Sequence, residues 1–141
     1  MTMPIIGYAG NDGESENLVF LRARGSAIEI DEVRMPAKMV LVLRLHEQSE
    51  KGIPLKVVKG LAEINITRYN IVNGEGVVLR KKNAVLIKCL GIGLEGENVT
   101  LKFAGKWARV DGGIYAIRLI GILRVDGSRI LLLLKGFAKT S

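Results

Sequence analysis

The sequence predicts an all-β protein: a single antiparallel domain that is either a β-sandwich or a small β-barrel built from hairpins, with at most one short helix. Turn signals recur about every 8 to 14 residues, with strand-like runs between them. Apolar and polar residues alternate in several of these runs, as in Val99-Thr100-Leu101-Lys102-Phe103. Hydrophobic residues make up 48% of the chain but aromatic residues only 5%, which predicts an aliphatic core.

Residues 1–17 end in the polar, glycine-rich run GNDGESEN and predict a flexible arm or loop ahead of one domain over 18–141. The helix candidate lies near 54–62, where Pro54 could begin a helix and the apolar residues have helical spacing, although Gly60 argues against it. Strands are predicted at 18–24, 27–34, 38–45, 61–72, 76–81, 84–90, 98–103, 106–111, 114–125 and 128–137. Turns are predicted at 24–26, 73–74, 82–83, 95–97, 105, 111–113 and 126–127.

The last two predicted strands form a hairpin whose register follows from its turn. Asp126-Gly127 suits a type I′ turn, because both central residues need positive φ. The resulting register pairs Leu123 with Ile130, Gly121 with Leu132 and Leu119 with Leu134 on the core face. On the other face it pairs Arg124 with Arg129, Ile122 with Leu131, Ile120 with Leu133, and Arg118 with Lys135.

That second face has an aliphatic centre between two basic pairs. Its four aliphatic side chains would not normally be left exposed together, so a second sheet or another subunit should cover them. We therefore predict an oligomer interface at Ile120, Ile122, Leu131 and Leu133. Directly opposed like charges destabilise a hairpin. A nearby acid such as Asp111 or Asp126, an anionic partner, or splaying of the side chains into water could offset this cost.

The charge is uneven along the chain. Residues 1–75 carry 9 Lys/Arg and 10 Asp/Glu, whereas residues 76–141 carry 12 and 4. A basic half indicates an anionic partner, most plausibly DNA or RNA; a solvated surface is the alternative. The predicted nucleic-acid-binding residues are Arg80, Lys81, Lys82, Lys102, Lys106, Arg109, Arg124 and Arg129, with Trp107 as a stacking platform.

The sequence argues against catalysis, cofactors and metal binding. His46 and Cys89 are the only residues of their kinds, and no cluster has metal-ligand spacing. Gly91-Ile92-Gly93-Leu94-Glu95-Gly96 matches a dinucleotide-binding pattern, but a strand-like run follows it where a helix is required. We expect a glycine-rich β-turn instead, and no small-molecule cofactor.

Composition also bears on location. A lone cysteine favours a reducing compartment, and neither a signal peptide nor a long uncharged apolar run is visible. These features predict a cytoplasmic protein, or a component of a particle assembled in the cytoplasm, that does not span a membrane. Abundant charge with few thermolabile residues resembles the composition of thermophile proteins.

Together these features favour a non-enzymatic, self-associating protein that presents a basic surface to nucleic acid. The alternatives are a structural subunit of a virion, filament or scaffold, and an accessory subunit of a larger hetero-complex.

Overall fold

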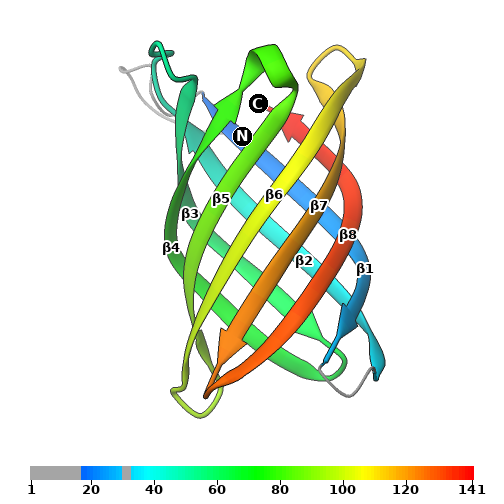
Figure 1. Ribbon diagram of the computed structural model, residues 1–141. Helices are drawn as coiled ribbons and strands as arrows, with labels where there is room; N and C mark the ends of the chain where they lie inside the picture. The colour runs from blue at the N-terminus through cyan, green and yellow to red at the C-terminus, as the bar shows by residue number, and fades with distance from the viewer. Residues whose placement is uncertain (1–16, 30–32) are drawn as a thin grey trace.

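The chain forms a closed antiparallel β-barrel of eight strands in which each strand pairs with the next and β8 pairs with β1 (Figure 1). This computed structural model describes residues 17–29 and 33–141. The all-β prediction is confirmed, and the architecture is the barrel rather than the sandwich. The strands are β1 (Leu18–Ile28), β2 (Arg34–Leu45), β3 (Ile53–Ile64), β4 (Thr67–Leu79), β5 (Ala84–Gly93), β6 (Asn98–Asp111), β7 (Ile114–Val125) and β8 (Ser128–Thr140).

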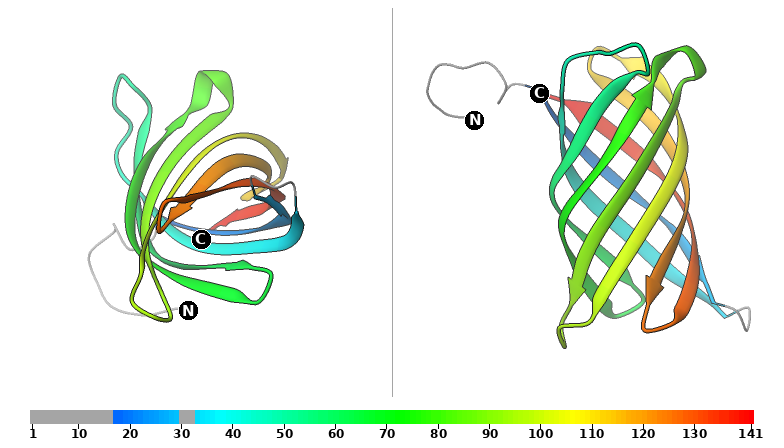
Figure 2. Two further views of the ribbon diagram at one scale, coloured as in Figure 1. Left: turned by 60° about the horizontal axis from the view of Figure 1, so that its bottom comes forward. Right: turned by 60° about the vertical axis from the view of Figure 1, so that its left-hand side comes forward.

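The barrel closes around an apolar interior, and Figure 2 shows the ring of strands from near one end. Strand alternation separates the two sides of the wall. In β5, for example, Val85, Ile87 and Cys89 are buried, whereas Leu86 and Lys88 are exposed. Among the described residues no polar or charged side chain is buried. Eight strands enclose a space that side chains can just fill, so apolar burial stabilises the closed ring.

The predicted register of the last hairpin is confirmed at every pair. Asp126 and Gly127 have φ of 47° and 80°, as a type I′ turn requires. Val125 faces Ser128, and the pairing continues up the hairpin to Ile114 opposite Lys139. The residues assigned to the core face are buried, and Leu119 and Leu123 have no exposed surface.

The helix predicted near 54–62 is wrong, because these residues belong to β3. The pairing with β2 shifts register at Val42/Leu43 and leaves Val58 as an extra residue, a β-bulge. Before the bulge the odd-numbered residues Leu55 and Val57 face inward, whereas after the bulge the even-numbered residues face inward. The apolar residues of the whole segment therefore have a spacing that resembles that of a helix.

Three predicted turns lie inside strands, which merges six of the ten predicted strands into three, and β3 replaces the predicted helix, so eight strands result. The strand predicted at 61–72 is divided by the turn between β3 and β4. Glycine signals at 24–26, 73–74 and 105 fall within β1, β4 and β6. The strand predicted at 27–34 does not form as one unit, because β1 ends at Ile28 and β2 begins at Arg34. The predicted turns at 82–83, 95–97, 111–113 and 126–127 are confirmed.

Glycines at the junction of β1 and β8 serve close approach instead of turning. A Cβ atom on Gly25 would collide with the carbonyl oxygen of Leu133, and one on Gly136 with that of Arg22. Both glycines allow the two terminal strands to bend against each other and complete the ring.

The N-terminal arm and the absence of a membrane-spanning helix were also predicted from the sequence. The N-terminal arm predicted over residues 1–17 lies, except for Asn17, outside the described residues. The Asn17 carbonyl oxygen accepts a hydrogen bond of 2.8 Å from the amide of Leu45. Within 17–29 and 33–141, no helix has the length and apolar character of a membrane span.

The burial of Cys89 leads to a reactivity prediction. The residue has no exposed surface, and burial raises the pKa of its thiol to about 12. Because the thiolate is the reactive form, a disulfide reagent such as DTNB should label the folded protein far more slowly than the urea-unfolded protein. Between pH 8 and pH 10 the folded thiol stays protonated, whereas the unfolded thiol ionises near pH 9. Folding stability from this group is therefore present below pH 9 and is lost as the pH rises toward 12. Rapid labelling of the folded protein at pH 8 would contradict the buried position.

Candidate nucleic-acid interface

Positive charge is concentrated on the outer wall of the barrel. All but four of the 21 Lys and Arg residues lie on strands, the exceptions being Lys51, Arg80, Lys81 and Lys82. The acidic residues of the strands are only Glu63, Glu75 and Asp111, and the other described acids lie in the connections. The wall is therefore strongly cationic, while the ends of the barrel are mixed.

Five of these cations form one line across five neighbouring strands. Lys106 of β6 pairs with Arg118 of β7, which pairs with Lys135 of β8. Lys135 pairs with Arg24 of β1, and Arg24 with Lys38 of β2. We call these five residues the cationic row. Since adjacent strands lie about 4.8 Å apart, the row is roughly 19 Å long.

The row ends at the one acidic side chain of this region, Glu63 of β3. Glu63 forms ion pairs of 3.2 Å with both Lys38 and Arg68, and hydrogen bonds from Arg68 and Lys38 lower its pKa. No other ion pair joins two residues within 17–29 and 33–141. Lys106, Arg118, Lys135 and Arg24 therefore have no carboxylate partner there.

The unpaired cations oppose one another directly. Like charges at opposed positions of a sheet destabilise it, typically by a few tenths to about 1 kcal/mol per pair. Lys106 directs its amine to the carbonyl oxygen of Lys82, at 3.2 Å, which is a neutral partner. The row thus presents charge to solvent at some cost to folding.

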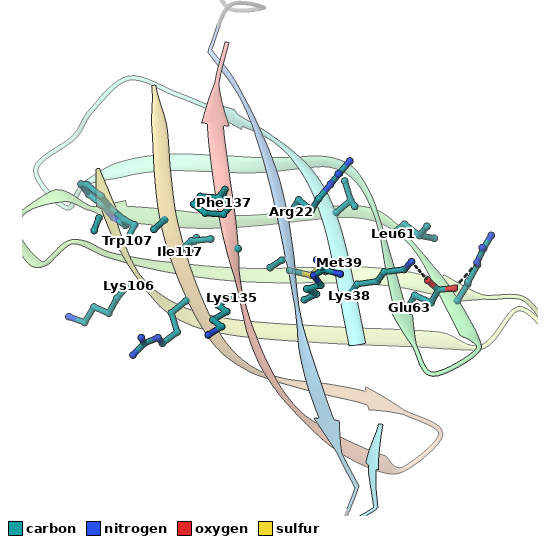
Figure 3. A pocket seen from close by; sticks show the side chains of 18 residues that line it. Arg22, Lys38, Met39, Leu61, Glu63, Lys106, Trp107, Ile117, Lys135 and Phe137 are labelled. Carbon is teal, nitrogen blue, oxygen red and sulfur yellow. Dashed lines mark hydrogen bonds and ion pairs between the residues drawn. The ribbon is translucent and has the colours of Figure 1, made fainter. Parts of the chain in front are cut away.

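A second line of side chains runs beside the cationic row, and the two together line an open groove of about 1080 Å³ (Figure 3). Five of its members lie two residues from the corresponding cation along their strand, and the sixth, Leu61, lies two residues from Glu63. Phe137 is the exposed aromatic of this line, with 58% of its surface accessible. We call this line the Phe137 row; in strand order it comprises Ala108, Ala116, Phe137, Arg22, Val40 and Leu61.

The structure brings some of the predicted binding residues near this groove. Lys106 belongs to the cationic row, and Arg80, Lys81 and Lys82 form the exposed 3-10 turn whose carbonyl Lys106 reaches. The Arg80 guanidinium donates a hydrogen bond of 3.2 Å to the side-chain oxygen of Gln48. This turn extends the positive surface beyond β6.

Trp107 and Arg109 follow the inward-facing alternation of β6. Trp107 is half-buried, packs edge-on against Tyr115 at 5.5 Å between ring centroids, and donates its indole N–H to the Ala84 carbonyl oxygen at 3.3 Å. Arg109 is exposed and pairs with Tyr115 near the end of β6. Trp107 is therefore held by internal contacts although it belongs to the lining of the groove, and the exposed aromatic of that lining is Phe137.

The remaining predicted residues gather nearer the opposite end of the barrel. Lys102 and Arg124 line a second open groove, of about 530 Å³, together with Ile120, Ile122 and Leu131. Leu133, beside Ile120, is only partly exposed. Neither acid suggested as a partner for Arg124 and Arg129 forms an ion pair with them in the described chain. Asp111 lies at the far end of β6 from Thr100, the partner of Arg124.

Sequence reasoning missed Arg22, Arg24 and Lys38, and it identified Arg118 and Lys135 only as an opposed pair. Alternation with Leu21 and Ala23 already placed Arg22 and Arg24 on the outer face. The strand that lies beside β1 is determined by the closure of the barrel, and no local sequence pattern predicts it.

The groove's chemistry is suited to anion binding. Its lining includes a single carboxylate, that of Glu63, which is held in its two ion pairs. His46 is exposed and lies outside this lining. In the part of the chain that the structure describes, no group of His, Cys, Asp or Glu could hold a metal ion. The dinucleotide-like glycine pattern forms the end of β5 and a turn before β6, without a helix.

Comparison with known protein families found no match, and neither characterised proteins nor solved structures gave a significant match.

Proposed function

We propose that this protein binds nucleic acid through its phosphate backbone, along the cationic row, without catalysing a reaction. The observation that carries the proposal is the direct pairing of Lys106, Arg118, Lys135 and Arg24 with no carboxylate partner among the described residues. An anion laid along the row would replace repulsion by charge-assisted hydrogen bonds.

The row's length favours a polyanion over a small anion. A single phosphate can contact two or three neighbouring cations, whereas the row places five over roughly 19 Å, four of them without a carboxylate partner among the described residues. Nucleic acids carry phosphates at regular intervals of a few ångströms. Binding of this kind depends mainly on charge, so it tolerates different base sequences. The single cysteine fits a cytoplasmic location, where such partners are available.

Neutralising the centre of the row should weaken binding and strengthen folding. We expect Arg24→Gln/Arg118→Gln/Lys135→Gln to lower the affinity for a 15-nucleotide oligonucleotide about tenfold or more at roughly 50 mM salt. The logarithmic salt dependence should become shallower by about 0.7 for each phosphate of a single strand that is no longer neutralised. Fluorescence anisotropy measures both quantities. In urea unfolding at low salt, the variant should be at least as stable as the parent, because opposed like charges are removed.

The matched control is Lys51→Gln/Lys56→Gln/Lys59→Gln, which removes the same charge from exposed residues of β3 and the loop before it. This variant should keep most of the affinity. Equal losses in the two triple variants would show diffuse attraction to the whole protein, and absence of binding by the parent would refute the proposal.

A second candidate function is assembly of copies of this chain through the aliphatic side of the barrel. Ile120, Ile122 and Leu131 are 54%, 37% and 38% exposed and lie on neighbouring strands around the second groove. Leu86 adds a further exposed side chain on β5, at 47%. A second copy that covered this patch would remove apolar surface from water.

Light scattering after size-exclusion chromatography tests the assembly. The parent should have a multiple of the 15.4 kDa chain mass, and Ile120→Ser/Leu131→Ser should shift it toward the monomer. Leu94→Ser, at an 80% exposed turn position, is the control and should leave the mass unchanged. A monomeric parent at high concentration would exclude self-association and leave a different chain as the partner of this patch.

A further inference from the structure

We infer that the groove selects single-stranded over duplex nucleic acid, with phosphates along the cationic row and bases against the Phe137 row. This inference rests on the proposed function and specifies its substrate class. Figure 3 shows Lys106, Lys135 and Lys38 in one line across the strands, with Phe137, Arg22 and Leu61 beside them.

The two rows are separated along each strand by two residues, which is about 7 Å at the usual rise of a β-strand. A nucleotide extended across the strands has its phosphate on one side and its base on the other, joined by the sugar. The parallel arrangement of a cationic line and a largely apolar line matches that division over β6, β7, β8, β1 and β2.

Phe137 has the surroundings that a stacked base requires. Its neighbours across the sheet are Ala116 on β7 and Arg22 on β1. Ala116 and Ala108 beyond it have short side chains, so little side-chain volume lies beside the Phe137 ring on that side. Arg22 on the other side can place its guanidinium over a base, since arginine contributes to binding of single strands in this way.

A duplex would use only part of this surface. Its bases are already stacked on one another and present edges, not faces, so Phe137 would have nothing to stack on. Reading those edges normally requires a helix or a two-stranded ribbon that enters the major groove. The groove here lies on the side of the barrel, and its lining residues all belong to the strands of the wall.

Phe137→Ala tests the assignment with a 15-nucleotide single strand and the same sequence annealed to its complement. The parent should bind the single strand more tightly at equal salt. The variant should lose roughly 5- to 100-fold in single-strand affinity, while its duplex affinity stays within about twofold. Its salt dependence should match that of the parent, because no phosphate contact is removed. Phe137→Trp should restore single-strand binding.

Phe20→Ala is the matched control, because Phe20 is 48% exposed on β1 but does not line the groove. It should retain the parent's affinity for both probes. Equal losses for Phe20→Ala and Phe137→Ala, or a parent that binds duplex as tightly as single strand, would overturn the single-strand inference while leaving phosphate binding intact. Repeating the measurements with DNA and RNA versions of both probes shows which of the two nucleic acids the groove binds more tightly. If neither strand form of either nucleic acid bound, both the inference and the proposed function would fall.

Discussion

The pairing of β8 with β1 is the constraint on which the rest of this molecule depends. It removes both exposed sheet edges and encloses an interior without a buried polar side chain in the described chain. It also places Arg24 beside Lys135, although the two residues are far apart in the sequence. Without closure, the cations of β1 and β2 would be separated from those of β6, β7 and β8. The same pairing therefore completes the core and joins the two halves of the cationic row.

If the row binds nucleic acid as we propose, its requirements for folding and for binding oppose each other. A wall that carries paired acids would fold with less repulsion, as Glu63 shows where it bridges Lys38 and Arg68. The centre of the row has no such acid among the described residues, so its charges stay available to a ligand. Proteins commonly accept reduced stability at functional sites, and the apolar interior contributes enough burial to tolerate several unfavourable surface pairs. A partner that neutralises the row would stabilise the barrel as it binds.

Local rules predicted the all-β class and the last hairpin. The Asp126-Gly127 turn fixed the register, and strict alternation then assigned both faces correctly. The same rules predicted turns at Gly25 and Gly105, which lie inside strands. They also predicted a helix in β3, because the bulge at Val58 interrupts the alternation of that strand. The sequence predicted only some residues of the candidate site, because Arg22 and Arg24 lie in the half of the chain with almost no net charge. Their alignment with Lys135 and Phe137 is a property of the closed barrel, which residue spacing does not encode.

The change in backbone amide chemical shifts when the protein is titrated with a single-stranded oligonucleotide tests most directly whether closure of the barrel builds the binding site. Binding along the two rows predicts one continuous set of changes that crosses the β8–β1 junction, includes Arg22, Arg24, Lys135 and Phe137, and fades as salt is raised. Changes confined to the Arg80–Lys82 turn, or to the neighbourhood of Lys102 and Arg124, would contradict it. Such a result would mean that the closure of the barrel builds the core but not the binding site.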